Sequence, residues 1–230
     1  MHQLVHWRLE RLTMDLYLIR HSQSINNKGD NHVDFPELTD LGYKQAYLAG
    51  KALKDINPVK LYCSPMLRAV QTAQKIGSVI NLDPQIIVEL HEGGGVYTLA
   101  PGKRIDGLKR SEILESCPNA ILPETVTEKG WQLHQAHTKE EGVRLIRKNM
   151  EKVINFLMEN HYDQEDKVAI ITHGRSGSIL ISTVLGMPPD RDYARFGQNN
   201  CGISLIRISS DVTRLVFLNR IDHMPLEYVT

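Results

Sequence analysis

The chain has 230 residues, and its 27 basic and 27 acidic side chains give a formal net charge of zero. This balance argues against a broad nucleic-acid or membrane surface, so the expected partner is a small molecule bound at a locally built site. No Pro/Ser/Gly-rich linker or block of like charge divides the chain, and we expect residues 1–230 to form one α/β domain.

Residues 1–13 are predicted to form an N-terminal extension, either a short amphipathic helix or an unstructured segment. They lack the apolar run and cleavage site of a signal peptide, and no stretch of the chain approaches 18 uninterrupted apolar residues. We therefore expect a cytoplasmic protein. Cys63, Cys117 and Cys201 lack CxxC spacing, so reduced thiols are predicted rather than disulfides.

The first predicted strand, DLYLIR over residues 15–20, ends on two residues that suit chemistry. Its consecutive apolar residues indicate burial on both faces, as in the interior of a parallel sheet. The strand stops at Arg20 and His21. In open α/β sheets ligands bind outside the carboxyl ends of the strands, so this pair is a candidate binding and catalytic element.

Two helices are expected after a polar loop over residues 22–37. Thr39 is predicted to cap the first helix, which Pro58 ends. A second strand over residues 59–63 leads into the second helix.

Ser64 is the predicted N-cap of that second helix, with Pro65 as its first residue. This places Arg68 in its first turn, beside the end of the second strand. Its side chain can then reach the same crevice as Arg20.

Residues 85–90 predict a third strand, which Glu92 follows. Residues 93–137 show only one helical pattern, near 111–116, and a segment of this kind is predicted to form a lid over the crevice. Its basic residues are either solvated charges or contacts for a second anionic group on the substrate: Lys103, Arg104, Lys109 and Arg110. Trp131 either packs the lid or lines the substrate pocket.

A second histidine ends a strand in the last third of the chain. A capping box of Thr138 and Glu141 predicts a long helix to about Asn160. The apolar strand that follows stops at His173. The remaining predicted elements are a helix over 175–185 and two antiparallel strands over 202–209 and 213–220.

Strand ends are thus predicted to bring together five side chains: Arg20, His21, Arg68, Glu92 and His173. Two arginines and two histidines suit a phosphate dianion, because guanidinium groups bind phosphate oxygens bidentately and stay charged. A neutral imidazole can attack phosphorus, and the arginines can neutralise the charge of the transition state without a metal or other cofactor. A carboxyl group that stays protonated can supply the leaving group with a proton.

Several ordered motifs resemble those of the histidine phosphatase superfamily, which has the phosphoglycerate mutase-like fold. LIRHSQSINN resembles the family's Arg-His-Gly-Glu-Ser/Thr-x-x-Asn opening, and LTDLGYKQA its Leu-Thr-x-x-Gly-x-x-Gln-Ala helix start. CSPMLRAVQTA and ITHG resemble its Ser-Pro-x-x-Arg-Ala-x-Gln-Thr and second His-Gly motifs. The resemblance implies a three-layer α/β/α sandwich whose sheet is mostly parallel, with an antiparallel edge strand.

The resemblance also implies a role for each matching residue. His21 is expected to become phosphorylated, while Arg20, Arg68 and His173 hold the phosphoryl group, with Gly174 from the second His-Gly motif also binding it.

Glu92 is the expected proton donor, since it fits the Leu-x-Glu pattern through Leu90 better than Glu89 does. Ser24 and Asn27 fall where the family commonly contacts phosphate. As turn residues they have an alternative role in stabilising the loop.

Ser22 and Gln23 depart from the Gly and Glu that usually follow the Arg-His pair. If the first of these positions needs a positive φ, a side chain there costs about 1–2 kcal/mol. The expected activity is metal-independent hydrolysis of a small phosphomonoester through a phosphohistidine. The alternatives are phosphoryl transfer of the phosphoglycerate mutase type and a catalytically silent phospho-ligand binding module.

Overall fold

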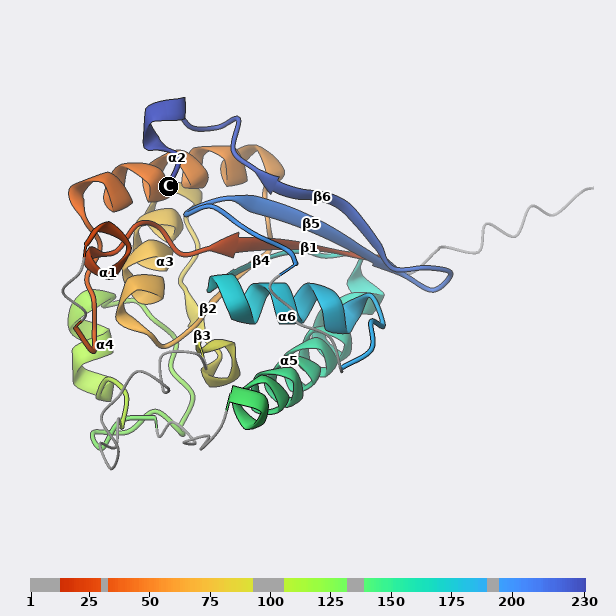
Figure 1. Cartoon of the computed structure of the whole chain (residues 1–230), viewed down its shortest axis with the longest axis horizontal. Helices are drawn as coiled ribbons and strands as arrows, with labels where there is room; N and C mark the ends of the chain where they lie inside the picture. Colours follow the sequence, from red (N-terminus) through yellow and green to blue (C-terminus); the bar gives the residue numbers. More distant parts are fainter. Residues whose placement is uncertain (1–12, 30–32, 93–105, 132–138, 190–194) are drawn as a thin grey trace, which may run out of the picture.

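A computed structural model describes residues 13–29, 33–92, 106–131, 139–189 and 195–230. They form one six-stranded sheet in the order β3-β2-β4-β1-β5-β6 (Figure 1). The strands are β1 (Thr13–Arg20), β2 (Lys60–Cys63), β3 (Gln85–Ile86), β4 (Lys167–Thr172), β5 (Ile203–Ser209) and β6 (Arg214–Arg220). Strands β1 to β4 pair in parallel, whereas β5 is antiparallel to both β1 and β6. The predicted sheet, mostly parallel with an antiparallel edge, is confirmed.

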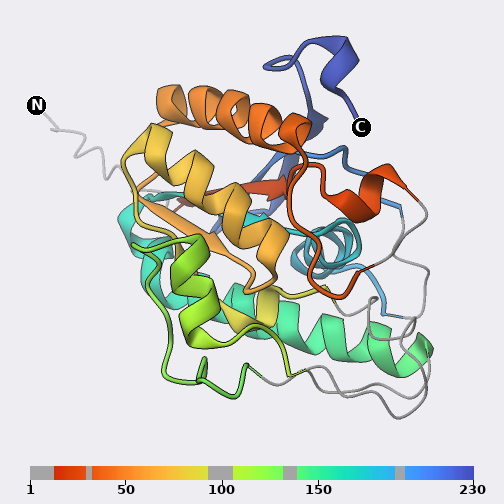
Figure 2. The same cartoon turned by 90° about the vertical axis from the view of Figure 1, so that its left-hand side faces the viewer.

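Helices cover both faces of this sheet, which gives the predicted three layers (Figures 1 and 2). The helices are α1 (Ile25–Lys28), α2 (Asp40–Ile56), α3 (Leu67–Ile80), α4 (Arg110–Ser116), α5 (Lys139–His161) and α6 (Gly174–Val184). Short 3-10 helices lie at η1 (Val88–Leu90), η3 (Tyr162–Gln164) and η4 (Leu226–Tyr228). One core cluster joins α2, α3 and α4 to the sheet, and a second joins α5 and α6 to its other face.

Strand β1 contributes to both core clusters, because its side chains point alternately to the two faces of the sheet. Tyr17 and Ile19 belong to the cluster with α2 and α3, while Leu16 and Leu18 belong to the cluster with α5 and α6. All four are buried, as the unbroken apolar run predicted. The strand begins at Thr13, so residue 13 belongs to the sheet rather than to the predicted extension; residues 1–12 lie outside the described residues.

The ends of α2 follow the sequence signals. The Thr39 hydroxyl accepts a hydrogen bond from the Gly42 amide at 3.0 Å, which satisfies a free N–H of the first turn. The helix ends at Ile56, and its C-cap Asn57 takes a left-handed conformation with φ of 55° just before Pro58.

The predicted start of α3 was wrong by two residues. The helix begins at Leu67, and Met66 occupies the N-cap without a side-chain cap. The Ser64 hydroxyl instead lies 2.8 Å from a ring nitrogen of His173. Arg68 nevertheless lies in the first turn, as predicted.

The predicted strand over residues 85–90 was also too long. It pairs with β2 over Gln85–Ile86 only, and the chain then turns through η1. Leu90 enters the core under α5, and the Thr172 hydroxyl donates to its carbonyl at 3.0 Å. Folding this segment over the end of β4 carries Glu92, two residues further on, toward the carboxyl edge of the sheet.

The predicted lid is described only over residues 106–131, where α4 confirms the helical pattern expected near 111–116. The Arg110 guanidinium donates to the carbonyls of Pro123 and Val126 at 3.3 and 3.2 Å, so this residue braces the segment. Trp131 is 4% exposed and stacks near the His91 ring, at 5.3 Å between centroids. It therefore packs the segment against the residue that precedes Glu92. Lys103, Arg104 and Thr138, whose roles were predicted from the sequence, lie outside the described residues.

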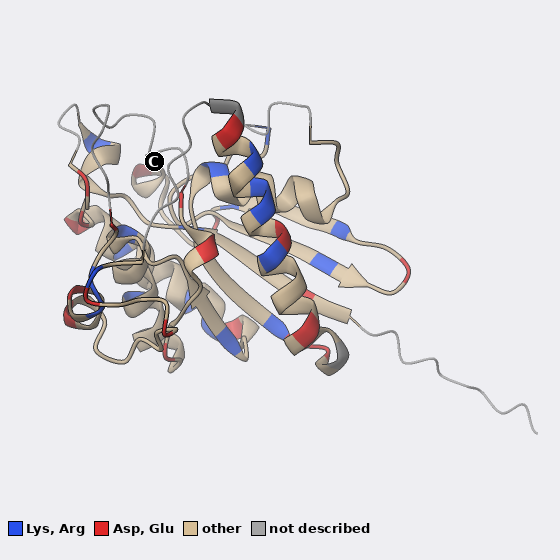
Figure 3. Ribbon diagram, turned by 90° about the horizontal axis from the view of Figure 1, so that it is seen from below, with Lys and Arg blue, Asp and Glu red and all other residues tan. Residues whose placement is uncertain are grey.

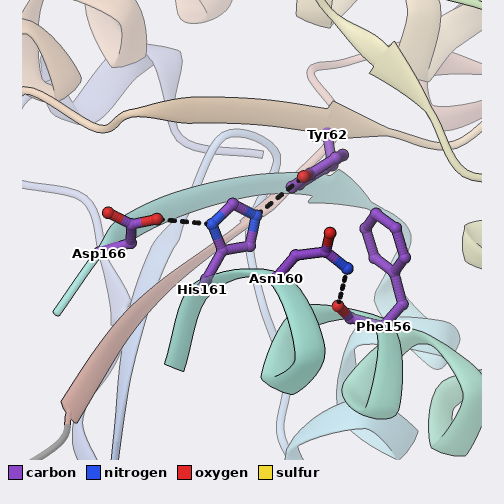
Figure 4. A network of polar contacts seen from close by, with 5 residues as sticks. All are labelled: Tyr62, Phe156, Asn160, His161 and Asp166. Atoms are coloured by element: carbon purple, nitrogen blue, oxygen red, sulfur yellow. Dashed lines mark hydrogen bonds and ion pairs between the residues drawn. The ribbon is translucent and has the colours of Figure 1, made fainter. Parts of the chain in front are cut away.

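Two hydrogen bonds among three polar side chains attach the end of α5 to the sheet, on the face away from α2 and α3 (Figure 4). His161 bonds through Nδ1 to Asp166 at 2.7 Å and through Nε2 to the Tyr62 hydroxyl at 2.8 Å. Burial, together with the charge of Asp166, raises the pKa of Tyr62. These hydrogen bonds link α5, β2 and the residue before β4. The buried polar groups are thus paired with one another and have a structural role.

Charges of both signs alternate along α5, in keeping with the zero net charge (Figure 3). Within the described ranges no helix has the length and apolar character needed to cross a membrane. The three cysteines are free thiols, as predicted, and all three are buried.

Gly42, the glycine of the LTDLGYKQA motif, packs closely against another part of the chain. A Cβ at this position would overlap the carbonyl oxygen of Gln23, in the loop after His21. We expect Gly42→Ala to destabilise the protein by about 1–3 kcal/mol in urea unfolding, because backbone must move to admit the methyl group. Gly29→Ala is the control, since no atom of the described residues beyond its chain neighbours lies within 4 Å of its added Cβ, and it should change stability by less than about 0.5 kcal/mol. Equal effects would contradict this packing.

Candidate active site

The carboxyl ends of three adjacent strands bring the predicted side chains together. Arg20 ends β1 and His21 follows it, while His173 follows β4, the parallel neighbour of β1. The His21 amide donates to the Thr172 carbonyl at 2.8 Å, which ties these two strand ends to each other. The His21 and His173 rings lie 5.1 Å apart between centroids.

His21 is held as one neutral tautomer. Its Nδ1 lies 2.8 Å from the Ser22 carbonyl oxygen, which can only accept, so Nδ1 carries the proton. Its Nε2 accepts a hydrogen bond from Nε of Arg68 at 3.1 Å. Burial, followed by the charges of Arg68 and Arg20, holds the pKa of His21 well below 6.5. The ring therefore keeps a lone pair on Nε2 at neutral pH.

Two guanidinium groups lie beside this nitrogen. Burial lowers the pKa of Arg68 to about 10, with Glu92 opposing the shift and Arg20 adding to it, so Arg68 stays charged at neutral pH. Burial also lowers the pKa of Arg20, again opposed by Glu92. Nη1 of Arg20 donates to the Gln198 carbonyl at 2.6 Å, and the guanidinium lies over Gly174, 3.7 Å from where a Cβ would stand.

His173 is completely buried and bonds through Nε2 to the Ser64 hydroxyl at 2.8 Å. Burial and the charge of Arg68 are the largest causes that hold its pKa well below 6.5. Both histidines of the site are therefore neutral, while both arginines carry charge.

Glu92 lies at the same site, and Glu89 does not. Oε2 of Glu92 accepts from the Arg175 amide at the start of α6 at 3.2 Å, and its charge acts on both Arg20 and Arg68. Glu89 lies in η1, with its carboxylate 3.7 Å from the Lys152 ammonium of α5. Glu92 is therefore the carboxyl group that the fold brings to the site, and its role as proton donor stays a prediction.

Three buried polar atoms of this site have no hydrogen-bond partner in the part of the chain that the structure describes: Nε of Arg20, Nδ1 of His173 and Oε1 of Glu92. Buried polar groups are normally paired, so such a group of atoms invites a ligand. A phosphate dianion offers acceptors for the arginine and histidine atoms, and a phosphate oxygen or ester oxygen can share a proton with the carboxyl group.

The side chains of Ser24 and Asn27 form a hydrogen bond with each other. The amide and the hydroxyl of Ser24 both donate to Oδ1 of Asn27, at 3.1 and 3.0 Å, which caps α1. The sequence predicted no helix here. This arrangement fits the loop-stabilising role, and a phosphate contact by either residue stays a prediction.

The two departures from the family pattern fit the backbone without strain. Ser22 is not among the described non-glycine residues with positive φ, and both its amide and its hydroxyl bond to the Thr72 hydroxyl, at 3.1 and 2.9 Å. The Gln23 side chain accepts from the Thr39 hydroxyl at 2.7 Å. The strain cost considered for a positive φ at Ser22 therefore does not arise.

Other side chains that shape the site were missed in the sequence. Ser64 was assigned to a helix cap, and Thr72 and Asn200 were given no role. Asn200 donates from Nδ2 to the His21 carbonyl at 2.8 Å, across 179 positions of sequence. For Ser64 and Thr72 the signal was present, because both stand inside the CSPMLRAVQTA motif.

Residues 16–221 match the histidine phosphatase superfamily (branch 1). The chain belongs to this superfamily, as its motifs indicated.

The relatives are phosphatases and mutases by name. "Probable phosphoglycerate mutase GpmB" of Erwinia tasmaniensis is 27% identical over 84% of this chain and 84% of its own length. A provisionally named phosphoserine phosphatase 2 of Hydrogenobacter thermophilus is 26% identical over 90% of this chain and 96% of its own.

A solved structure shares the fold. The phosphoserine phosphatase of Entamoeba histolytica, crystallised as a mutant with phosphoserine, has a TM-score of 0.63 at 21% identity, covering 92% of this chain and 100% of that one. Together with the family, these similarities support a phosphatase or mutase-like activity. Among the described residues no group of three or more His, Cys, Asp or Glu side chains is placed to hold a metal ion.

The neutral state of His21 can be tested by NMR titration of its ring. We expect its pKa to lie below 6.5 and to rise toward the ordinary value in Arg68→Gln, because the second-largest cause of the shift is removed. Arg20→Gln should raise it less, since that charge acts more weakly. Arg214→Gln, on exposed β6, is the control and should leave it unchanged. A wild-type pKa at or above 6.5 would contradict the described environment.

Proposed function

We propose that the protein is a metal-independent phosphatase that hydrolyses a small phosphomonoester through a phosphohistidine on His21. The observation that carries this proposal is the lone pair on Nε2 of a neutral imidazole, 3.1 Å from the Arg68 guanidinium. A nucleophile is thereby adjacent to a cation that can hold the phosphoryl group it attacks.

In the first half of the reaction, the Arg68 N–H that bonds to Nε2 of His21 turns to a phosphate oxygen, which frees the lone pair of Nε2. Nε2 then attacks phosphorus as the P–O ester bond breaks. Arg20 and Arg68 neutralise the equatorial oxygens, and His173 binds the same group through its free ring nitrogen. With the phosphate dianion bound beside it, Glu92 holds a proton, which it gives to the departing alkoxide, so the alcohol leaves neutral. The Ser22 carbonyl stabilises the positive charge that the imidazole acquires, through the hydrogen bond to Nδ1.

In the second half, water attacks the phosphohistidine. The Glu92 carboxylate takes a proton from this water, the N–P bond breaks, and inorganic phosphate leaves. His21 returns to its neutral tautomer and Glu92 is again protonated, so no metal or second substrate is required.

A mutase of the phosphoglycerate type is the second candidate, favoured by the name of the Erwinia relative. Such an enzyme shares the first half but returns the phosphoryl group to an acceptor instead of water, which requires a site that excludes water. The stretch HEGGGVYTLAPG fits the Tyr-Gly-x-Leu-x-Gly pattern of family mutases poorly, so we favour hydrolysis. Phosphoserine and 3-phosphoglycerate, present in structures of the Entamoeba enzyme, are the first substrates to test. Release of phosphate supports the hydrolase, and exchange of isomers with a bisphosphate primer supports the mutase.

The proposal predicts separate roles for His21 and Glu92 in assays with EDTA. His21→Ala should lower kcat about a thousandfold or more for every phosphomonoester, because the nucleophile is lost. Glu92→Gln should lower kcat about 10²–10⁴-fold for an alkyl phosphate and less for p-nitrophenyl phosphate, whose leaving group needs no proton.

Glu89→Gln is the matched control for the second variant and should keep wild-type kcat, since Glu89 pairs with Lys152 outside the site. Turnover that survives in His21→Ala would refute the mechanism. Wild-type protein that binds phosphate but turns over none of these esters would support the silent binding module instead.

A further inference from the structure

The loop after His21 is held by side chains that come from other parts of the chain. The His21 carbonyl accepts from Nδ2 of Asn200 at 2.8 Å. The Gln23 amide donates to Oε1 of Gln45, in α2, at 2.7 Å. Two side-chain amides thus grip the backbone on either side of Ser22 and set where the His21 ring stands.

Both side-chain amides form hydrogen bonds with the same hydroxyl group, that of Thr230. Oγ1 of Thr230 donates to Oδ1 of Asn200 at 3.1 Å and accepts from Nε2 of Gln45 at 3.0 Å. Asn200 and Gln45 are 1% and 0% exposed, so water cannot replace this partner at the amides without an opening of the structure. Backbone bonds hold Thr230 in place, because its carbonyl accepts from the Asn200 amide at 2.8 Å.

We propose that Thr230 is a positioning residue for the catalytic loop, acting through Asn200 and Gln45. A side-chain amide can rotate by 180° and exchange its donor with its acceptor. A hydroxyl has one proton, so once Thr230 donates to Asn200 it must accept from Gln45. This fixes Asn200 with its NH₂ group toward the His21 carbonyl. Gln45 is held with its oxygen toward the Gln23 amide by Thr230 and also by the Tyr228 carbonyl, which accepts from Nε2 of Gln45 at 2.6 Å.

A rotated Asn200 would instead direct an oxygen at the His21 carbonyl, and the two acceptors would repel each other. The loop would then shift, and Nε2 of His21 would lose its alignment with phosphorus. Since substrate is gripped by the arginines, whose own contacts do not include Thr230, the effect should fall on kcat rather than on KM. This inference rests on the proposed function for its kinetic consequence, but its effect on the loop does not.

The test compares Thr230→Val, which keeps the shape and removes the hydroxyl, with Thr230→Ser, which keeps the hydroxyl. We expect Thr230→Val to lower kcat for p-nitrophenyl phosphate about five- to tenfold with KM within twofold, as the lost hydrogen bond to Asn200 implies, because Nε2 of Gln45 keeps the Tyr228 carbonyl as a partner. Thr230→Ser should retain wild-type kcat. In Thr230→Val, NMR-detected exchange of the Gln23 amide should accelerate about five- to tenfold, while amides of β4 stay unchanged.

Unchanged exchange at Gln23 in Thr230→Val overturns the inference, whatever the activity. Equal acceleration in β4 also overturns it, because the hydroxyl would then support the whole fold rather than the loop. Wild-type protein without turnover would defeat the proposed function alone, since the exchange measurement still decides whether Thr230 positions the loop.

Discussion

The site depends on the hydrogen bond between Nδ1 of His21 and the Ser22 carbonyl. That bond fixes the proton on Nδ1 and leaves the lone pair on Nε2, which faces Arg68. Burial and two neighbouring cations keep the ring neutral. If the ring were protonated, three positive groups would stand together in a buried space with no free nucleophilic nitrogen. The packing of β1 between two cores fixes the backbone that carries Arg20 and His21, because this backbone cannot shift without moving a buried strand.

The charges around this ring are organised for a ligand that brings its own negative charge. Arg20 and Arg68 are both half-buried and both lie within the field of Glu92, yet Nε of Arg20, Nδ1 of His173 and Oε1 of Glu92 lack partners among the described residues. A phosphoryl group supplies the missing acceptors. The same preference for a dianion explains why the site needs no broad positive surface, and the protein as a whole is neutral.

The sequence predicted the parts of the site that lie at strand ends. Arg20, His21 and His173 follow apolar strands, and Arg68 follows a helix start, so local patterns and parallel topology sufficed to bring them together. Local patterns failed where a distant contact decides the structure. The strand at residues 85–90 ends early because Leu90 packs into the core under α5. Ser64 is not the N-cap of α3 because its hydroxyl contacts His173. The contact of Asn200 with His21 spans most of the chain and leaves no periodic signal.

The most direct test of the account is to trap the phosphoenzyme. Wild-type protein mixed with ³²P-labelled phosphomonoester and quenched in alkali within milliseconds should carry label on a single histidine, because phosphohistidine survives base and is lost in acid. Peptide mapping should locate the label at His21, with phosphorus on Nε2, since Nδ1 is occupied by the Ser22 carbonyl. Label on another residue, or steady turnover with no labelled protein under conditions where phosphate release is slow, would contradict the central claim.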